Sequence, residues 1–367
     1  MRDEIKRRLD RIDELFPPER LARSKAKWTA LYSGEPLVGG MPYTAMPPTV
    51  GIYLAAFDKK KRLEELLDDI ITRGALDDDY IPALFTGCRQ SAIPSMFGAE
   101  EFLLDDDLGN KKIIHSADDI KAMPAPGFPD GSSAKYWIEM EEYFLCETEG
   151  RIPCHVCDMQ GPFDAAGQVW SYDEAFVLAY EDPDLYEEFM GKLVEAYMLL
   201  WKTQQDLLGD LFVGTHLYGW NWTPQNWGAS MSVDSLVMLS TNFYDTFYKP
   251  VIERIAANFG SISMHSCGNF AQIVPNICAT RGLAAINASQ MNLRELYEAG
   301  MTPGKIAIFF VPWDQAEEMA NLSRRTGVGV DMSVHGIFND KVYTSWTEAD
   351  FARVADMGKI MREKLAL

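Results

Sequence analysis

"SISMHSCG" (residues 261–268) reads as a buried strand that ends in polar side chains. Three similar runs follow it at close spacing: LAAINAS (283–289), KIAIFFVPW (305–313) and GVGVDMSVHG (327–336). Short apolar runs that alternate with helical patterns are typical of parallel strands joined by helices. The last third of the chain therefore predicts an α/β fold in which several strands end in polar groups.

Earlier parts of the chain carry the same pattern. Candidate strands lie at residues 37–43, 81–87, 152–160 and 211–219. With the four later runs they make eight strands, which predicts a (β/α)8 TIM barrel. A doubly wound open sheet is the competing fold. No G-x-G-x-x-G motif follows the first strand, however, and this removes the main support for a dinucleotide-binding version of that fold.

The whole chain, residues 1–367, is expected to form a single domain. Residues 1–35 read as two helices, the second ending at Gly34, and they predict an N-terminal helical extension. Residues 88–150 are less regular than the rest and are predicted to form an insertion or a lid.

Composition limits the kind of partner. The formal net charge of −20 argues against nucleic acid and anionic membranes. The acidic runs 77–79 and 105–107 are expected to be solvated loops. No stretch has about 18 uninterrupted apolar residues, and the N-terminus lacks the apolar segment of a signal peptide. Six cysteines in 367 residues do not indicate a disulfide framework, so a cytoplasmic location is predicted.

His265 and Cys267 are the first candidates for chemistry. Residues i and i+2 of a strand point to the same side, so the imidazole and the thiol are presented together. They lie at the carboxyl end of the strand, where barrel enzymes build their active sites. Two interpretations stay open at this point: two satisfied interior side chains, or half of a metal site.

The stretch HSCGN (265–269), which follows FYDTFYKPVIERIAANFG (243–260), resembles the uroporphyrinogen decarboxylase superfamily. Within it, the chain is most similar to cobalamin-dependent methyltransferases of the corrinoid:coenzyme M type, which carry an H-x-C zinc motif here. Other segments also resemble the superfamily: ERLARSKAKWTALYSGE (19–35), DDDYIPALFTG (77–87), IPCHVCDMQGPFDAAG (152–167) and EDPDLYEEFMGKLVEAY (181–197). The resemblance implies a (β/α)8 barrel with its ligand site at the strand ends.

Two departures from the family pattern matter. The decarboxylase binds its substrate through an arginine-rich first strand, but here no arginine lies between Arg23 and Arg62. The zinc methyltransferases take a further cysteine from the last strand, but here no cysteine follows Cys278. His335, at the end of the eighth predicted strand, lies close to that place. A zinc site of His265, Cys267 and His335 is therefore expected, with a fourth position open for substrate.

Asp158 is the predicted catalytic residue. It ends the strand of residues 152–160, at a place where the superfamily has a residue facing the cavity. A carboxylate that caps the following Gly161–Pro162 loop is the alternative.

Further polar and aromatic residues are predicted to bind substrate. They follow strand ends or alternate along THLYGWNW (215–222), and ordinary core packing or helix capping explains them equally well. The set comprises His216, Tyr218, Trp220, Asn221, Asp234 and Gln290.

The resemblance implies a methyltransferase that uses Zn2+. It would move a methyl group between a corrinoid cofactor, such as methylcobalamin, and a thiol or tetrahydrofolate acceptor. The corrinoid would be carried by a separate corrinoid protein or taken as a small-molecule donor. Two alternatives stay open: a metal-independent decarboxylase or other lyase acting through Asp158, and a protein that binds a tetrapyrrole or corrinoid without turning it over.

Overall fold

The computed structural model describes residues 2–45, 58–87, 91–104, 107–214, 221–336 and 345–366. Its largest sheet is parallel, with the strand order β1 (Tyr43–Ala45), β11 (Gly329–His335), β10 (Ile306–Pro312), β9 (Leu283–Ala288), β8 (Ile262–Ser266), β7 (Ala229–Ser232). A second parallel sheet contains β2 (Leu84–Phe85), β5 (Cys154–His155) and β6 (Phe212–Val213). The fold is therefore mixed α/β with mainly parallel strands, which confirms the predicted class. Closure into a (β/α)8 barrel stays a prediction.

The two sheets are linked through one parallel bridge between Gln160, beyond β5, and Ser232 in β7. The segment that contains Gln160 begins with β5. There it pairs with β6, since Cys154 is the register partner of Phe212. The chain after β5 thus runs first beside β6 and then beside β7. A separate antiparallel hairpin is formed by β3 (Glu101–Leu104) and β4 (Asp107–Asn110).

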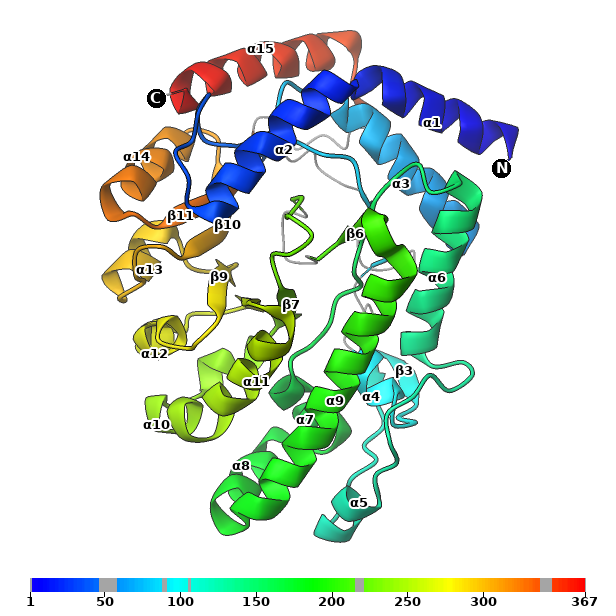
Figure 1. The fold of residues 1–367 in the computed structure, drawn as a ribbon, viewed down its shortest axis with the longest axis vertical. Helices are drawn as coiled ribbons and strands as arrows, with labels where there is room; N and C mark the ends of the chain where they lie inside the picture. The colour runs from blue at the N-terminus through cyan, green and yellow to red at the C-terminus, as the bar shows by residue number, and fades with distance from the viewer. Residues whose placement is uncertain are drawn as a thin grey trace.

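Helices surround the strands on the outside of the molecule (Figure 1). None of those in the described residues is long and apolar enough to cross a membrane. In chain order they are α1 (Asp3–Leu15), α2 (Pro18–Ser33), α3 (Lys59–Arg73), α4 (Ala92–Ser95), α5 (Ala117–Ala122), α6 (Ser133–Thr148), α7 (Pro162–Val169), α8 (Tyr172–Glu181), α9 (Pro183–Leu208), α10 (Thr241–Phe243), α11 (Lys249–Phe259), α12 (Val274–Cys278), α13 (Leu293–Glu298), α14 (Ala316–Thr326) and α15 (Glu348–Leu365).

Four short turns also occur in the described part of the chain. Three are 3-10 turns and one is a single π-helical turn: η1 (Gly209–Leu211), η2 (Asp234–Met238), η4 (Ala271–Ile273) and the π turn η3 (Tyr244–Tyr248). The η2 turn directly follows β7 and carries a residue of the site described below.

The strands bury both faces, as parallel strands do. In β8, Ile262 and Met264 belong to the main apolar core. Ser263 and His265 alternate with them and therefore lie on the opposite, inner face. The inner face is the one that carries polar groups.

The two N-terminal helices lie where the sequence predicts them, and α2 ends at Gly34, whose φ of 68° suits a residue without a side chain. Trp28, Leu31 and Tyr32 of α2 pack into a second, smaller core. Its other members are Ile81 before β2, Ile306 at the start of β10, and Ala285 and Ile308, which are the third residues of β9 and β10, with Trp222 and Trp227 at its edge. Helix α2 therefore covers the amino-terminal parts of β9 and β10 and also contacts β11.

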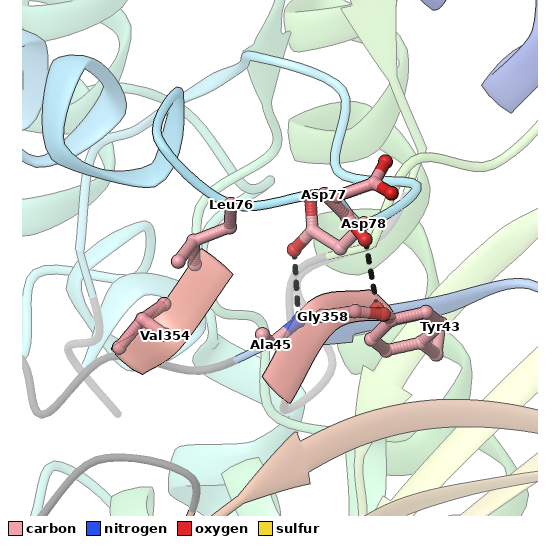
Figure 2. Close-up of a pocket in the computed structure, with 7 residues that line it drawn as sticks. All are labelled: Tyr43, Ala45, Leu76, Asp77, Asp78, Val354 and Gly358. Carbon is pink, nitrogen blue, oxygen red and sulfur yellow. Dashed lines mark hydrogen bonds between the residues drawn. The ribbon is translucent and has the colours of Figure 1, made fainter. Parts of the chain in front are cut away.

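Only Asp77 of the acidic run 77–79 is exposed, so the predicted solvated loop is wrong for Asp78 and Asp79. Asp78 and Asp79 are buried, and the backbone N–H groups of Ala45 and Tyr80 donate to Asp78. Figure 2 shows this segment above β1, where the Tyr43 hydroxyl also donates to the carbonyl of Asp77.

Cations from two helices explain this burial. Arg362 of α15 lies 2.6 Å from Asp79, and Lys27 of α2 lies 3.5 Å from the same carboxylate. Arg20 of α2 lies 3.3 Å from Asp78. Opposite charges within this distance offset the cost of removing a carboxylate from water. The other acidic run, 105–107, has no described side chains.

Residues 91–148 contain α4, the β3–β4 hairpin, α5 and α6. Helix α6 contacts α1, α3 and α9 in the outer layer of helices. The predicted role of residues 88–150 as an insertion or lid is not decided by these contacts and stays a prediction, as does the single domain.

Candidate metal centre

The ends of two neighbouring strands build the candidate site. β7 and β8 pair in a register that sets Ser232 beside His265, and the Val233 N–H donates to the His265 carbonyl (2.7 Å). One residue further on, the chain turns into η2 at Asp234. The register of the two strands therefore carries Asp234 to His265 and Cys267.

Asp234, His265 and Cys267 each offer one ligand atom, and these atoms all lie within 4.8 Å of one another. His265 Nε2 is 3.5 Å from Cys267 Sγ and 3.5 Å from Asp234 Oδ1. The usual bond lengths of tetrahedral zinc put nitrogen and sulfur about 3.6 Å apart, and nitrogen and oxygen about 3.4 Å apart. The donor set and its spacing fit a zinc ion.

His265 is held from behind by β9. Its Nδ1 lies 2.5 Å from Asn287 Oδ1, and the Asn287 amide donates to the carbonyl of Ile308 in β10 (2.7 Å). His265 and Asn287 are both buried. The ring is therefore fixed by neighbouring strands rather than by a loop.

Cys267 is half-buried, at the mouth of the site. Its backbone N–H donates to Asp234 Oδ1 (2.8 Å), and the Ser289 hydroxyl donates to its sulfur (3.6 Å). Burial raises the pKa of the thiol, and the hydrogen bond from Ser289 opposes this. The charges of Asp234 and Asp158 raise the pKa further, because they repel a thiolate. A bound cation would reverse this repulsion.

Gly268 makes the tight approach at the mouth feasible. Its φ is +77°, and a Cβ atom placed on it would lie 2.6 Å from Val237 Cγ1. A side chain at this position would be strained by the positive φ and would have to displace the Val237 methyl group. The glycine of the H-x-C-G run therefore lets the backbone after Cys267 turn close to η2.

Asp164 of α7, which is not among the site residues predicted from the sequence, fixes the start of η2. The backbone N–H of Ser235 donates to Asp164 Oδ1 (3.0 Å) and its hydroxyl to Oδ2 (2.9 Å). Burial, followed by the charge of Asp234, raises the pKa of Asp164 to about 7. The available signal was an acidic residue inside the apolar helix sequence PFDAAGQV (162–169).

Asp158, the predicted catalytic residue, is 8% exposed. It accepts a hydrogen bond from the hydroxyl of Ser232 (2.9 Å), which is the β7 partner of His265. Asp158 is therefore placed beside the candidate metal centre, and its charge contributes to the raised pKa of Cys267. Its catalytic role stays a prediction.

Two further predicted residues lie at strand ends. Gln290 is exposed and follows β9, and its Oε1 is 3.8 Å from the place of a Cβ on Gly268. His335 is exposed at the end of β11. The register aligns His265 with Asp331 of β11, so His335 lies four residues, or roughly 13 Å, further along. It is not part of the Asp234–His265–Cys267 group, and its ligand role stays a prediction.

The predicted substrate residues around 215–222 have different outcomes. His216, Tyr218 and Trp220 lie outside the described residues. Asn221 is buried and donates to Asp331 and Ser333 of β11 (3.3 Å to the latter), while its Oδ1 accepts from Thr44 of β1 (2.8 Å). Because its polar atoms are bonded to the protein, Asn221 helps hold the inner face together.

A comparison with solved structures finds the same fold in a methyltransferase from Methanosarcina mazei. The match covers 93% of this chain and 98% of that chain, with a TM-score of 0.63 and 14% sequence identity. No family model matches the sequence, and no curated protein is similar to it. At this identity, the likeness concerns the fold.

Proposed function

We propose that this chain is a zinc-dependent methyltransferase of the uroporphyrinogen decarboxylase superfamily. The observation that carries the proposal is the meeting of Asp234, His265 and Cys267 at the ends of β7 and β8. Three protein ligands of this kind with one open position are typical of catalytic zinc. The fold shared with a solved methyltransferase supports the same conclusion.

The proposal includes a closed (β/α)8 barrel in which β6 and β7 share one strand position. The pairing of the chain after β5, first with β6 and then with β7, supports this. In such a barrel the carboxyl ends of all strands face one mouth, where active sites lie. Asp234, His265 and Cys267 follow strand ends, and Asp158 follows β5.

Each residue has a proposed role. Asp234, His265 and Cys267 hold the zinc, which, when bound, supplies the charge that favours the thiolate form of an acceptor thiol. Asp158 accepts the proton that the acceptor thiol loses, since its carboxylate lies at the same mouth. Ser289 and Asp164 keep Cys267 and the η2 turn in place.

The proposed reaction moves a methyl group from a corrinoid to a thiol. The sulfur–carbon bond forms while the cobalt–carbon bond breaks, and its electron pair stays on cobalt. The donor is methylcobalamin, free or on a separate corrinoid protein, and tetrahydrofolate is the alternative acceptor. Cys146, Cys154, Cys267 and Cys278 are in the thiol form, which suits the proposed cytoplasmic location.

Elemental analysis of the purified protein tests the metal centre. We expect one zinc per chain in the wild type and none in Asp234→Ala, His265→Ala or Cys267→Ala. His115→Ala is the matched control, because this exposed histidine lies outside the group, and it should keep its zinc. A wild type that binds no zinc, even after incubation with Zn2+, would contradict the proposal.

A methyl-transfer assay tests the reaction itself. Methylcobalamin and a thiol are mixed with the protein, and demethylation is followed by the cobalamin absorbance. We expect turnover with the wild type, none with Cys267→Ala, and circular dichroism that shows both proteins folded. Chelator-resistant release of CO2 from a carboxylated substrate, without demethylation, would support the lyase alternative instead.

A further inference from the structure

Asn287 lies fully buried in β9, between the strand that carries His265 and the strand that carries Ile308. It is the register partner of both residues, so its side chain bridges β8 and β10. A buried amide in this position has to satisfy a donor and an acceptor at once. The way it does so fixes the chemistry of His265.

The orientation of the Asn287 amide follows from its second partner. The carbonyl oxygen of Ile308 accepts hydrogen bonds only, so the group 2.7 Å away from it is the NH2 of Asn287. Asn287 Oδ1 is therefore the atom that faces His265 Nδ1, at 2.5 Å. The hydrogen-bond network assigns this side chain in a single way.

An amide oxygen also accepts only, so His265 Nδ1 has to carry a proton. In a neutral imidazole the other nitrogen, Nε2, then carries a lone pair. That lone pair points toward Cys267 Sγ and Asp234 Oδ1, each 3.5 Å away. Three electron-pair donors thus face one another, an arrangement that a cation between them stabilises.

We propose that Asn287 is a positioning residue that holds His265 in its metal-binding tautomer and orientation. The inference rests on the proposed metal centre, and it adds a residue that does not itself touch the metal. Groups that bind the far nitrogen of a ligating histidine affect metal affinity by about 10- to 100-fold. Asn287 provides that bond from the middle of a buried strand, where it cannot move away.

The tautomer can be measured without any metal. Nitrogen-15 NMR of the metal-free protein at about pH 8, where an ordinary imidazole is neutral, distinguishes a protonated Nδ1 from a protonated Nε2. We expect the Nδ1–H tautomer for His265, assigned by the signal lost in His265→Ala. A predominant Nε2–H tautomer, or a doubly protonated ring, would overturn the inference.

Metal affinity provides the second measurement, with Co2+ as the probe because its absorption reports thiolate coordination. Asn287→Leu removes both hydrogen bonds and should weaken Co2+ binding by about 10- to 100-fold. Asn287→Asp keeps an acceptor for Nδ1–H, and it should restore most of the affinity. Unchanged affinity in Asn287→Leu would overturn the inference.

Gln204→Leu is the matched control for loss of a buried amide. Gln204 of α9 is also fully buried and bonded at both ends, to Cys157 N (2.7 Å) and Leu200 O (3.2 Å). It should lose stability without losing Co2+ affinity. If the wild type binds no Co2+, the proposed function fails, whereas the NMR result still decides the tautomer.

Discussion

Asp331 shows what a single buried carboxyl group does on the inner face of the sheet. It accepts hydrogen bonds from the Tyr32 hydroxyl of α2 and from the Asn221 amide. Burial nevertheless raises its pKa to about 6, because two hydrogen bonds compensate only part of the lost hydration. The folded state therefore binds this proton more tightly than the unfolded chain does.

This shift predicts the pH dependence of stability. The contribution of Asp331 is fully present below its unfolded pKa, near 3.8, and is lost as the pH rises through about 6. Between about pH 5 and pH 7.5, the loss amounts to roughly 1 kcal/mol. Asp331→Asn should show a smaller change, measured by urea unfolding at both pH values. Equal changes in the two proteins would refute the prediction.

Glu141 of α6 is the opposite case, a buried carboxyl group without compensation. It is fully buried, and neither of its oxygens has a hydrogen-bond partner in the described residues. Burial raises its pKa well above the ordinary range. Glu141→Met, which removes the buried polar group at similar length, should stabilise the protein by about 1–3 kcal/mol at neutral pH.

The control for this substitution is the exposed neighbour Glu142. Glu142→Met should change the free energy of unfolding by less than about 0.5 kcal/mol. Both variants are compared with the wild type by urea unfolding. A Glu141→Met protein less stable than the wild type would show that this carboxyl group has a stabilising role.

At the scale of elements, the buried acidic run ties helices to β1. Asp79 is paired with Lys27 of α2 and Arg362 of α15; Asp79 and Lys27 are buried, and Arg362 is half-buried. Removing the carboxylate leaves the buried Lys27 ammonium without its partner. Asp79→Ala should therefore destabilise the protein by about 3–5 kcal/mol.

Asp77 is the natural comparison, two residues earlier in the same run. Its side chain is 54% exposed and lies 3.5 Å from Arg362. Exposed pairs contribute about 0–1 kcal/mol, so Asp77→Ala should have little effect. Thermal and urea unfolding of the two variants measure the difference. Similar losses in both would contradict the account of burial given for Asp79.

Elements also show how far the sequence could predict this site. The period of two along 261–268 was enough to place His265 and Cys267 together. β7 was missed, since ASMS contains no β-branched or aromatic residue and becomes a strand only by pairing with β8. Asp234 lies at the site because of the register in which β7 pairs with β8, and no local sequence pattern encodes that register. The solvated loop expected at 77–79 was wrong because the compensating cations lie on distant helices.

At the scale of the whole molecule, a bound metal should stabilise the fold. Asp234 follows β7, and His265 and Cys267 belong to β8 and its end, so an ion would link two strands and a turn. A ligand that binds only the folded state adds about 2.7 kcal/mol when its concentration is 100 times Kd.

Thermal unfolding with and without Zn2+ measures this effect. The wild type should unfold at a higher temperature with Zn2+ than after chelation, and Asp234→Ala should not respond. His115→Ala, at an exposed histidine outside the group, should respond like the wild type. An equal increase in Asp234→Ala would place the stabilising ion elsewhere.

The position of α2 has a consequence for how substrates would reach the candidate site. Trp28, Leu31 and Tyr32 are buried against the amino-terminal parts of strands in the described residues. In the proposed reaction, two substrates that meet at Cys267 would therefore share the approach from the carboxyl ends of the strands. A bulky donor bound on that side would block the access of a small acceptor that had not yet bound. The packing of one helix thus favours a fixed order of arrival, with the smaller molecule first.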